Sequence, residues 1–302
     1  MKKILLTGGT GLIGTHLTRK LQEKGYQVAL LSRSAKSDLS FPVYPWNPDK
    51  GEMDDKALDY ADYIIHLAGV NIGDKRWTPH RKQQILESRV KSGELLLNAL
   101  AKRKSKPKAF ISASAIGYYG AVSSDAIFDE TAPAHSDFLG QTCESWEGVA
   151  DRFKENGVRS VKIRTGIVLS KQGGALSKLS LPIRYGVGAP IGSGKQYMPW
   201  IHIEDLCGIF IHAIEHPQLA GAYNAVAPEH ITNRELTKRI ARGLRKPLWL
   251  PNIPSSFLRL LFGEMSAMLL QGSRVSSDKI RATGFSFQYP KIDPALQELN
   301  SK

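Results

Sequence analysis

The chain has 302 residues, of which 42% are hydrophobic, and it carries a formal charge of +13 with a pI near 9.6. This length and composition allow one large folded domain, or a domain with an annex, and exclude a disordered or fibrous protein. No uninterrupted apolar run approaches the ~20 residues that cross a bilayer, and the apolar stretch after residues 1–3 is too short for a secretion signal. We therefore expect a cytoplasmic protein with no membrane partner.

The positive charge invites a nucleic-acid hypothesis, because phosphate backbones attract Lys and Arg. The basic residues are spread along the chain, and the dense run at 102–108 lies where a helix should stop before a strand. Cations favour that end of a helix dipole, so a solvated face explains the run and we expect no nucleic-acid partner. Cys143 and Cys207 are the two cysteines, and they predict neither a disulfide framework nor a zinc site.

The first predicted element is a short apolar strand that runs into a glycine turn and a helix. Residues 4–6 are apolar, the turn reads Thr-Gly-Gly-Thr-Gly-Leu-Ile-Gly at 7–14, and apolar residues continue beyond it at helical spacing. Glycines at 8, 11 and 14 allow a tight turn and a close approach to a pyrophosphate. The free N–H groups at the helix start would then face the anion. The cofactor contacts predicted in this turn are Gly8, Thr10, Gly11, Leu12 and Ile13.

Strands and helices alternate through the first half of the chain. We predict strands at 26–31, 63–69, 109–112 and 161–164, and helices at 81–103 and 138–156, the last closed by Gly157. Repeated units of this length predict an α/β fold, a doubly wound parallel sheet with helices on both faces.

The final third is interrupted by prolines and contains a capping-box pattern at 232–235 that starts a helix. This predicts a dinucleotide-binding domain over residues 1–170. A smaller C-terminal α/β lobe over residues 171–302 would be partly interleaved with the sheet.

The end of the second strand predicts which dinucleotide is bound. NAD sites place an acidic residue there for the ribose 2′-hydroxyl, but this chain has Ser32 and Arg33. A guanidinium can pair with a 2′-phosphate, which a carboxylate would repel. Asp38 lies too far along the chain to serve as the ribose acceptor. We therefore expect NADP, with an ordinary exposed arginine as the alternative interpretation of Arg33.

These residues resemble the extended, epimerase-like branch of the short-chain dehydrogenase/reductase superfamily. The resemblance is carried by the turn at 7–14, by His66-Leu67-Ala68-Gly69, and by the strand end at 112–120. More narrowly, the strings at 71–77, 87–89, 192–205 and 283–287 are similar to the "epimerase family protein" group, sometimes labelled cell-division-inhibitor homologues. Together these strings span nearly the whole chain.

The resemblance implies which further residues line the NADP site. They are Ser32, Arg33, Leu67, Ala68, Gly69, Arg89, Arg164 and Ile167. Arg89 would be a second cation near the 2′-phosphate or the pyrophosphate, although it could also be a solvent-facing helix residue. Superfamily members often pair through helices that flank the sheet, so this chain could form a homodimer.

One feature of the superfamily is missing from this sequence. Ordinary members carry Tyr-x-x-x-Lys, in which the lysine lowers the phenol pKa from about 10 and allows proton exchange near pH 7. No tyrosine here has a lysine four residues later, and Leu139 and Cys143 stand where the pair would fall.

Three interpretations of this absence stay open. Tyr118, close to the retained Ser114, could replace the missing phenol, or it could be a packing residue. Cys143 or Glu147 could act as acid or base, although a buried cysteine commonly behaves as a small apolar residue. Alternatively, catalysis could be lost and the cofactor kept.

A Gly/Pro-rich loop holds Gln196, Trp200 and His202, where extended members approach their substrate; a packing role is the equal alternative.

The leading hypothesis is an NADP(H)-binding oxidoreductase or nucleotide-sugar-epimerase-like enzyme that acts on a small carbonyl or hydroxyl compound. Ser114 would orient the reacting oxygen, and Tyr118 would donate the proton. A non-catalytic, NADP-responsive regulator or partner protein is the alternative hypothesis.

Overall fold

The computed structural model describes residues 1–34 and 41–301. Asp38 lies outside these described residues. An eight-stranded sheet forms the centre, in the order β12-β8-β6-β5-β1-β2-β3-β4, and every pairing in it is parallel except that of β3 with β4. The strands are β1 (Lys3–Thr7), β2 (Gln27–Ser32), β3 (Val43–Asn47), β4 (Glu52–Met53), β5 (Tyr63–His66), β6 (Ala109–Ala115), β7 (Ile127–Phe128), β8 (Arg159–Thr165), β9 (Ile167–Ser170), β10 (Gly173–Gly174), β11 (Trp200–His202), β12 (Gly221–Ala225) and β13 (Arg274–Val275).

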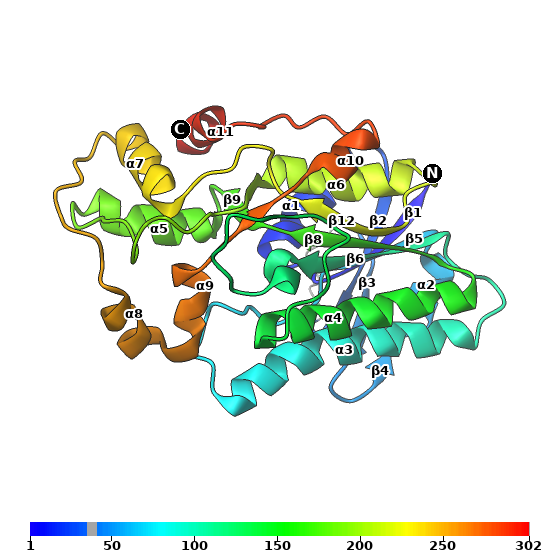
Figure 1. Ribbon diagram of the computed structural model, residues 1–302. Coiled ribbons are helices and arrows are strands. Elements are labelled where there is room, and N and C mark those ends of the chain that lie inside the picture. The colour runs from blue at the N-terminus through cyan, green and yellow to red at the C-terminus, as the bar shows by residue number, and fades with distance from the viewer. Residues whose placement is uncertain (35–40, 302) are drawn as a thin grey trace.

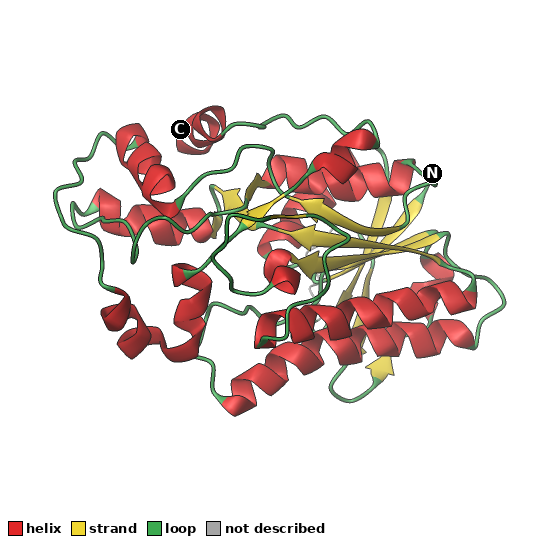
Figure 2. Ribbon diagram, in the orientation of Figure 1, coloured by secondary structure: helices red, strands yellow, loops and turns green. Residues whose placement is uncertain are grey.

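Helices cover both faces of this sheet (Figures 1 and 2), and the predicted doubly wound fold is confirmed. They are α1 (Leu12–Glu23), α2 (Lys56–Tyr60), α3 (Pro79–Ala101), η1 (Ile116–Tyr119), α4 (Phe138–Arg152), η2 (Phe153–Asn156), α5 (Ala175–Arg184), α6 (Ile203–Glu215), α7 (Asn233–Gly243), α8 (Ser255–Phe262), η3 (Gly263–Ser266), α9 (Ala267–Leu270), α10 (Asp278–Ala282) and α11 (Ile292–Asn300).

Two apolar layers hold the helices to the sheet because side chains alternate along each strand. On one face, Leu6 of β1 packs with Leu17 of α1 and Phe210 of α6. On the other face, Leu5 packs in the layer that contains Leu97 of α3. Burial of this many apolar side chains is the main favourable contribution to the fold.

The C-terminal lobe has its own core around Trp200, which is fully buried with side chains from α5, α7 and α11. Its small sheet joins β10, β9 and β11, whereas β12 extends the central sheet beside β8. Residues 171–301 therefore contribute to both regions. The predicted capping box is confirmed, since Thr232 and Glu235 exchange both hydrogen bonds at the start of α7.

Most differences from the predicted elements lie at their ends. The predicted helix 138–156 finishes with the 3₁₀ turn η2, and Gly157 closes it with φ of 72°. The third strand ends at His66, three residues earlier than predicted, because Leu67 to Gly69 leave the sheet at its carboxyl edge. Strand β6 continues to Ala115, past the predicted end at Ser112, and so carries Ser114 within the sheet.

Candidate functional site

The glycine turn lies where the order of the sheet reverses, between β1 and β5. Chain connections leave β1 toward β2 on one side and β5 toward β6 on the other, and ligands bind at such switch points in open α/β sheets. Gly8 has φ of 69°, and a Cβ there would lie 2.8 Å from the Leu67 carbonyl carbon. A Cβ on Gly14 would lie 2.2 Å from the Gly8 oxygen. Glycine is therefore required at both positions.

The start of α1 offers the backbone donors that a phosphate needs. Gly11 is the N-cap residue, and within the described residues no side chain caps this helix end. The first amides of the helix are thus left for water or a ligand. Thr10 and Gly11 are exposed and Leu12 is half-buried, so the predicted contacts in the turn share one accessible edge. Ile13 also packs against the core.

Thr7, His66 and Ser92 connect this turn to β5 and α3. The Thr7 hydroxyl lies 2.8 Å from His66 Nδ1 and accepts hydrogen bonds from the amides of Leu67 and Ala68, each at 3.2 Å. Ser92 donates to the Ser88 carbonyl, which leaves its oxygen as the acceptor for His66 Nε2 at 3.2 Å. The network thus fixes a neutral tautomer with the proton on Nε2.

Burial lowers the pKa of His66 to about 4, which agrees with a neutral ring. Sequence inspection missed Thr7 and Ser92 as partners, since 59 residues separate Thr7 from His66.

The predicted determinants of the adenosine end lie at the carboxyl edge of the sheet. Ser32 ends β2 and Arg33 follows it, exposed to solvent. Arg89 of α3 lies against the segment after β5, where its Nη1 donates to the Ile85 carbonyl at 2.8 Å and its Nη2 donates to the Val70 carbonyl at 3.2 Å. Burial lowers its pKa below the ordinary arginine value. Arg89 is therefore not the solvent-facing helix residue of the alternative interpretation.

The second cluster joins Ser114, Glu147 and Arg164, all at most 5% exposed. Arg164 donates to both carboxylate oxygens of Glu147, from Nε at 2.8 Å and from Nη2 at 2.9 Å. Ser114 donates its hydroxyl to Glu147 Oε1 at 2.7 Å. Burial opposes the charge on Arg164, but the hydrogen bonds and charge of Glu147 raise its pKa above the ordinary value.

The two neighbouring tyrosines of η1 have different surroundings. The Arg164 guanidinium carbon lies 3.5 Å from the ring centroid of Tyr118, which is half-buried. Tyr119 is buried, donates its hydroxyl to Asn224 at 2.8 Å, and accepts from Arg164 at 3.0 Å. Burial raises the pKa of Tyr119 to about 12, so it has a structural role. Of these two tyrosines, Tyr118 is the less buried.

Helix α4, which should carry the tyrosine and the lysine, packs against η1. A Cβ on Gly117 would lie 3.4 Å from Leu139 Cβ and 3.6 Å from Cys143 Sγ. Burial raises the pKa of the Cys143 thiol to about 12, which makes it a poor acid or base near pH 7. Apolar packing therefore occupies the place of the missing proton relay.

The structure assigns structural roles to the polar residues of the Gly/Pro-rich loop. Trp200 donates to the Glu229 carbonyl, and Gln196 donates to the carbonyls of Ile191 and Leu269. His202 caps α6 by accepting the Glu204 amide on Nδ1, so its Nε2 proton points at Glu298 of α11. All three are at most 3% exposed, which supports the packing alternative for this loop. Ile167 begins β9 directly beside Trp200 of β11.

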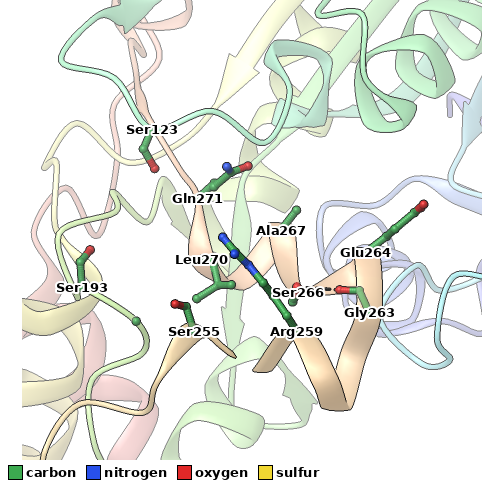
Figure 3. Close-up of a pocket in the computed structure, with 11 residues that line it drawn as sticks. Ser123, Ser193, Ser255, Arg259, Gly263, Glu264, Ser266, Ala267, Leu270 and Gln271 are labelled. Atoms are coloured by element: carbon green, nitrogen blue, oxygen red, sulfur yellow. Dashed lines mark hydrogen bonds between the residues drawn. The ribbon is translucent and has the colours of Figure 1, made fainter. Parts of the chain in front are cut away.

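A pocket of about 610 Å³ lies between the connection that follows η1 and the C-terminal segments (Figure 3). Four serines give its wall hydroxyl character, and the Arg259 guanidinium points into it toward Leu270 and Gln271. Its lining is Ser123, Gly192, Ser193, Ser255, Arg259, Gly263, Glu264, Ser266, Ala267, Leu270 and Gln271. The sequence did not predict a site here, and the lining comes from three separated segments, at 123, 192–193 and 255–271.

Comparison with known proteins places this geometry in a family. The sequence model of the NAD dependent epimerase/dehydratase family matches residues 4–226. These residues include the turn, the Ser114 cluster and β12. The chain belongs to this epimerase/dehydratase family. A further family model, of a domain of unknown function (DUF1731), matches residues 253–299, from just before α8 to the last turn of α11.

Relatives of similar length exist in the epimerase/dehydratase family. The chain is 36% identical to the epimerase family protein YfhF of Bacillus subtilis, over 98% of this chain and 97% of that protein. It is equally similar to the human epimerase family protein SDR39U1, whose crystal structure with NADPH superposes with a TM-score of 0.88 over 98% of both chains. A nucleoside-diphosphate sugar epimerase from Corynebacterium glutamicum is 30% identical, with a TM-score of 0.80 over 99% of this chain and 58% of that one. The UDP-glucose 4-epimerase of Thermus thermophilus, at 19% identity, shares the fold.

Proposed function

We propose that this chain is an NADP(H)-binding enzyme that carries out redox or epimerase-like chemistry on a small hydroxyl or carbonyl compound. The observation that carries the proposal is the glycine turn at the switch point, with an uncapped helix start and Arg33 at the end of β2. The NADPH in the structure of the human relative supports the same choice of cofactor. Bound NADP(H) would supply or accept a hydride at the nicotinamide ring.

The residues of the chain fit a phosphorylated dinucleotide at both ends. The turn at 7–14 would hold the pyrophosphate, since its glycines leave room for a close approach that a Cβ would block. Arg33 and Ser32 would hold the 2′-phosphate, and Arg89 would contribute positive charge behind the segment 67–70. The Arg164 guanidinium donates its hydrogen bonds to Glu147 and Tyr119, within the Ser114 cluster. Its contribution to cofactor binding would therefore be indirect.

Cofactor selection can be tested by calorimetry. An Arg33→Asp variant should lose at least about tenfold in NADPH affinity, because it loses a charge-assisted contact and gains a repulsive carboxylate. Its NADH affinity should change little. Lys102→Asp, with the same charge change at the far end of α3, is the matched control. Equal NADPH affinity in Arg33→Asp and the wild type would refute this assignment.

The direction of the hydrogen bond between Ser114 and Glu147 is defined in this arrangement. Glu147 accepts two hydrogen bonds from Arg164 and therefore cannot donate to Ser114, so the serine hydroxyl is the donor between them. The serine oxygen is left with lone pairs only. Ser114 would accordingly accept a hydrogen bond from a substrate hydroxyl, and Tyr118 would exchange the proton of the reacting group.

Turnover can be followed by NADPH absorbance against a panel of carbonyl compounds, and by NADP⁺ reduction with the matching alcohols. Ser114→Ala and Tyr118→Phe should each lower kcat by about 100-fold or more. Tyr185→Phe, which changes a tyrosine that is 78% exposed on the C-terminal lobe, is the control. Unchanged turnover in both site variants would refute the two roles.

A second candidate function is a regulator that binds NADP(H) without turning it over. The buried Leu139 and Cys143, in place of a tyrosine and a lysine, are the observation that favours it. This function requires tight NADPH binding and no consumption of the cofactor by any compound in the panel. Repeated cycles of NADPH oxidation with one substrate would exclude it.

A further inference from the structure

Exposed apolar side chains gather at one end of the C-terminal lobe. Among the described residues, nine large hydrophobic side chains are exposed, and all but Met1 and Ile127 lie in or next to α5 and α8. Single exposed apolar residues are ordinary on protein surfaces, whereas a concentration of them marks an interaction site. We call this surface the apolar end, and it consists of Leu181, Tyr185, Val187, Trp249, Phe257, Leu260 and Leu261.

Backbone contacts hold the two parts of the apolar end side by side. Ile253 pairs with Ile191 in a parallel bridge, and Gly192 donates its amide to the Ile253 carbonyl at 2.9 Å. The Trp249 indole donates to the Gly186 carbonyl at 2.9 Å, which places Trp249 over the end of α5. Helix α8 begins two residues after Ile253, and Figure 1 shows α5 and α8 at the same end of the molecule, away from the central sheet.

The same segments carry a one-sided charge. Residues 175–203 and 236–263 contain nine Lys or Arg and no Asp or Glu. Arg184, Arg245 and Lys246 are exposed within a few residues of Leu181, Tyr185 and Trp249.

The combination of charge and apolar side chains favours one kind of partner. A second copy of the chain would bring two positive surfaces together, which costs free energy. Single-stranded nucleic acid prefers basic grooves with stacked aromatic rings, but four of the seven apolar side chains are aliphatic. Exposed Leu and Phe with Trp, Lys and Arg are the residues that amphipathic helices use at anionic membrane interfaces.

We infer that the apolar end docks reversibly on an anionic lipid surface, with α8 and Trp249 entering the headgroup region. Among residues 1–34 and 41–301, no helix is long and apolar enough to cross a membrane. The inference concerns peripheral contact and departs from the expectation of no membrane partner, which rested on the lack of a long apolar run and of a secretion signal in the sequence. It goes beyond the proposed function and does not depend on cofactor binding.

Cosedimentation with vesicles tests the inference. The full chain should sediment with vesicles of an equal mixture of phosphatidylcholine and phosphatidylglycerol, and should stay in solution with phosphatidylcholine alone. Raising the salt concentration should weaken binding because it screens the charges. Tryptophan emission should shift to shorter wavelength on binding, and this shift should be lost in Trp249→Leu.

Paired variants separate docking from general effects. Leu260→Ser should lower the partition coefficient about tenfold, given the loss of one inserted aliphatic side chain. Ile127→Ser, at a side chain that is 53% exposed outside the apolar end, should leave it unchanged. The double charge reversal Arg245→Glu with Lys246→Glu should abolish the preference for anionic vesicles, whereas Lys102→Glu with Lys104→Glu should preserve it. Unchanged NADPH affinity in each variant would show that the fold is intact.

Three results would overturn the inference. The first is equal partition of the wild type into both kinds of vesicle, or into neither. The second is a stable dimer without lipid that Leu260→Ser dissociates, which would assign the apolar end to a second copy. The third is salt-resistant binding of single-stranded RNA that requires Trp249.

Discussion

The turn at 7–14 and the cluster around Ser114 lie at the same edge of the sheet but are built in different ways. The turn is made of consecutive residues, and its shape depends on the absence of side chains at Gly8 and Gly14. The cluster brings together side chains from β6, α4 and β8, and its shape depends on a buried ion pair. Steric space therefore determines the shape of the turn, and electrostatic attraction determines the shape of the cluster.

This difference teaches where each region tolerates change. The turn fails when a side chain is added at Gly8 or Gly14, because the backbone that the new Cβ would meet cannot move aside cheaply. A buried ion pair fails when one partner is removed, because the other charge is left without compensation. Removing both partners together is less costly. The following substitutions test these expectations, from the largest effect to the smallest.

Arg164→Met should have the largest effect on stability. It leaves the Glu147 carboxylate buried with Lys162 Nζ at 3.8 Å as the remaining ion-pair partner, and should lower the free energy of unfolding by about 4 kcal/mol. Urea unfolding at pH 7 measures this. The double variant Arg164→Met with Glu147→Gln should be more stable than Arg164→Met alone, since it no longer buries the Glu147 carboxylate without its guanidinium partner. Additive losses in the double variant would show that the ion pair is not the cause.

Gly14→Ala should come next. The new Cβ would lie 2.2 Å from the Gly8 carbonyl oxygen, so the turn must distort, and we expect a loss of about 3 kcal/mol together with most of the NADPH affinity. Gly148→Ala is the matched control in α4. Within the described residues, a Cβ at Gly148 would meet no atom within 4 Å apart from its chain neighbours and the adjacent helix backbone, and the helix should gain about 1 kcal/mol. Calorimetry that finds wild-type NADPH affinity in Gly14→Ala would contradict the space argument.

We expect His66 to have a smaller effect on the free energy of unfolding, and this effect depends on pH. Its pKa is about 4 in the folded protein and 6.5 as the ordinary value, so the unfolded chain binds the proton more readily. The stabilising contribution of the neutral ring is fully present above pH 6.5 and is lost as the pH falls toward 4. Between pH 7 and pH 5 the loss should be about 2 kcal/mol. Urea unfolding of the wild type and of His66→Gln at both pH values measures this loss. The free energy of unfolding should depend less on pH in the variant. An equal pH dependence in the two proteins would disprove the assignment of this loss to His66.

Much of the architecture could be predicted because it is encoded locally. The glycine turn, the alternating strands and helices, and the capping box at 232–235 all depend on residues close together in the chain, and each is confirmed. The pairing of β12 with β8 in the central sheet could not be derived from such patterns. It joins residues about sixty positions apart, and no local spacing specifies that contact.

The candidate site divides in the same way. The sequence identified Ser114, Tyr118 and Glu147 as separate candidates, and the structure brings them together through Arg164. The structure also distinguishes the adjacent residues Tyr118 and Tyr119. The Tyr118 ring lies against the Arg164 guanidinium, whereas the Tyr119 hydroxyl donates to Asn224. The pocket around Arg259 was missed because its wall combines serines that carry no periodic signal.

The sequence by itself determined the doubly wound sheet, the position of the dinucleotide turn and the absence of the tyrosine–lysine pair, because steric limits and periodicity act over a few neighbouring residues. Only the tertiary structure decided which way the Ser114 hydroxyl points, which tautomer His66 adopts and where the exposed apolar residues meet. Those properties depend on side chains that lie far apart in the chain and become neighbours only when the strands are ordered into a sheet.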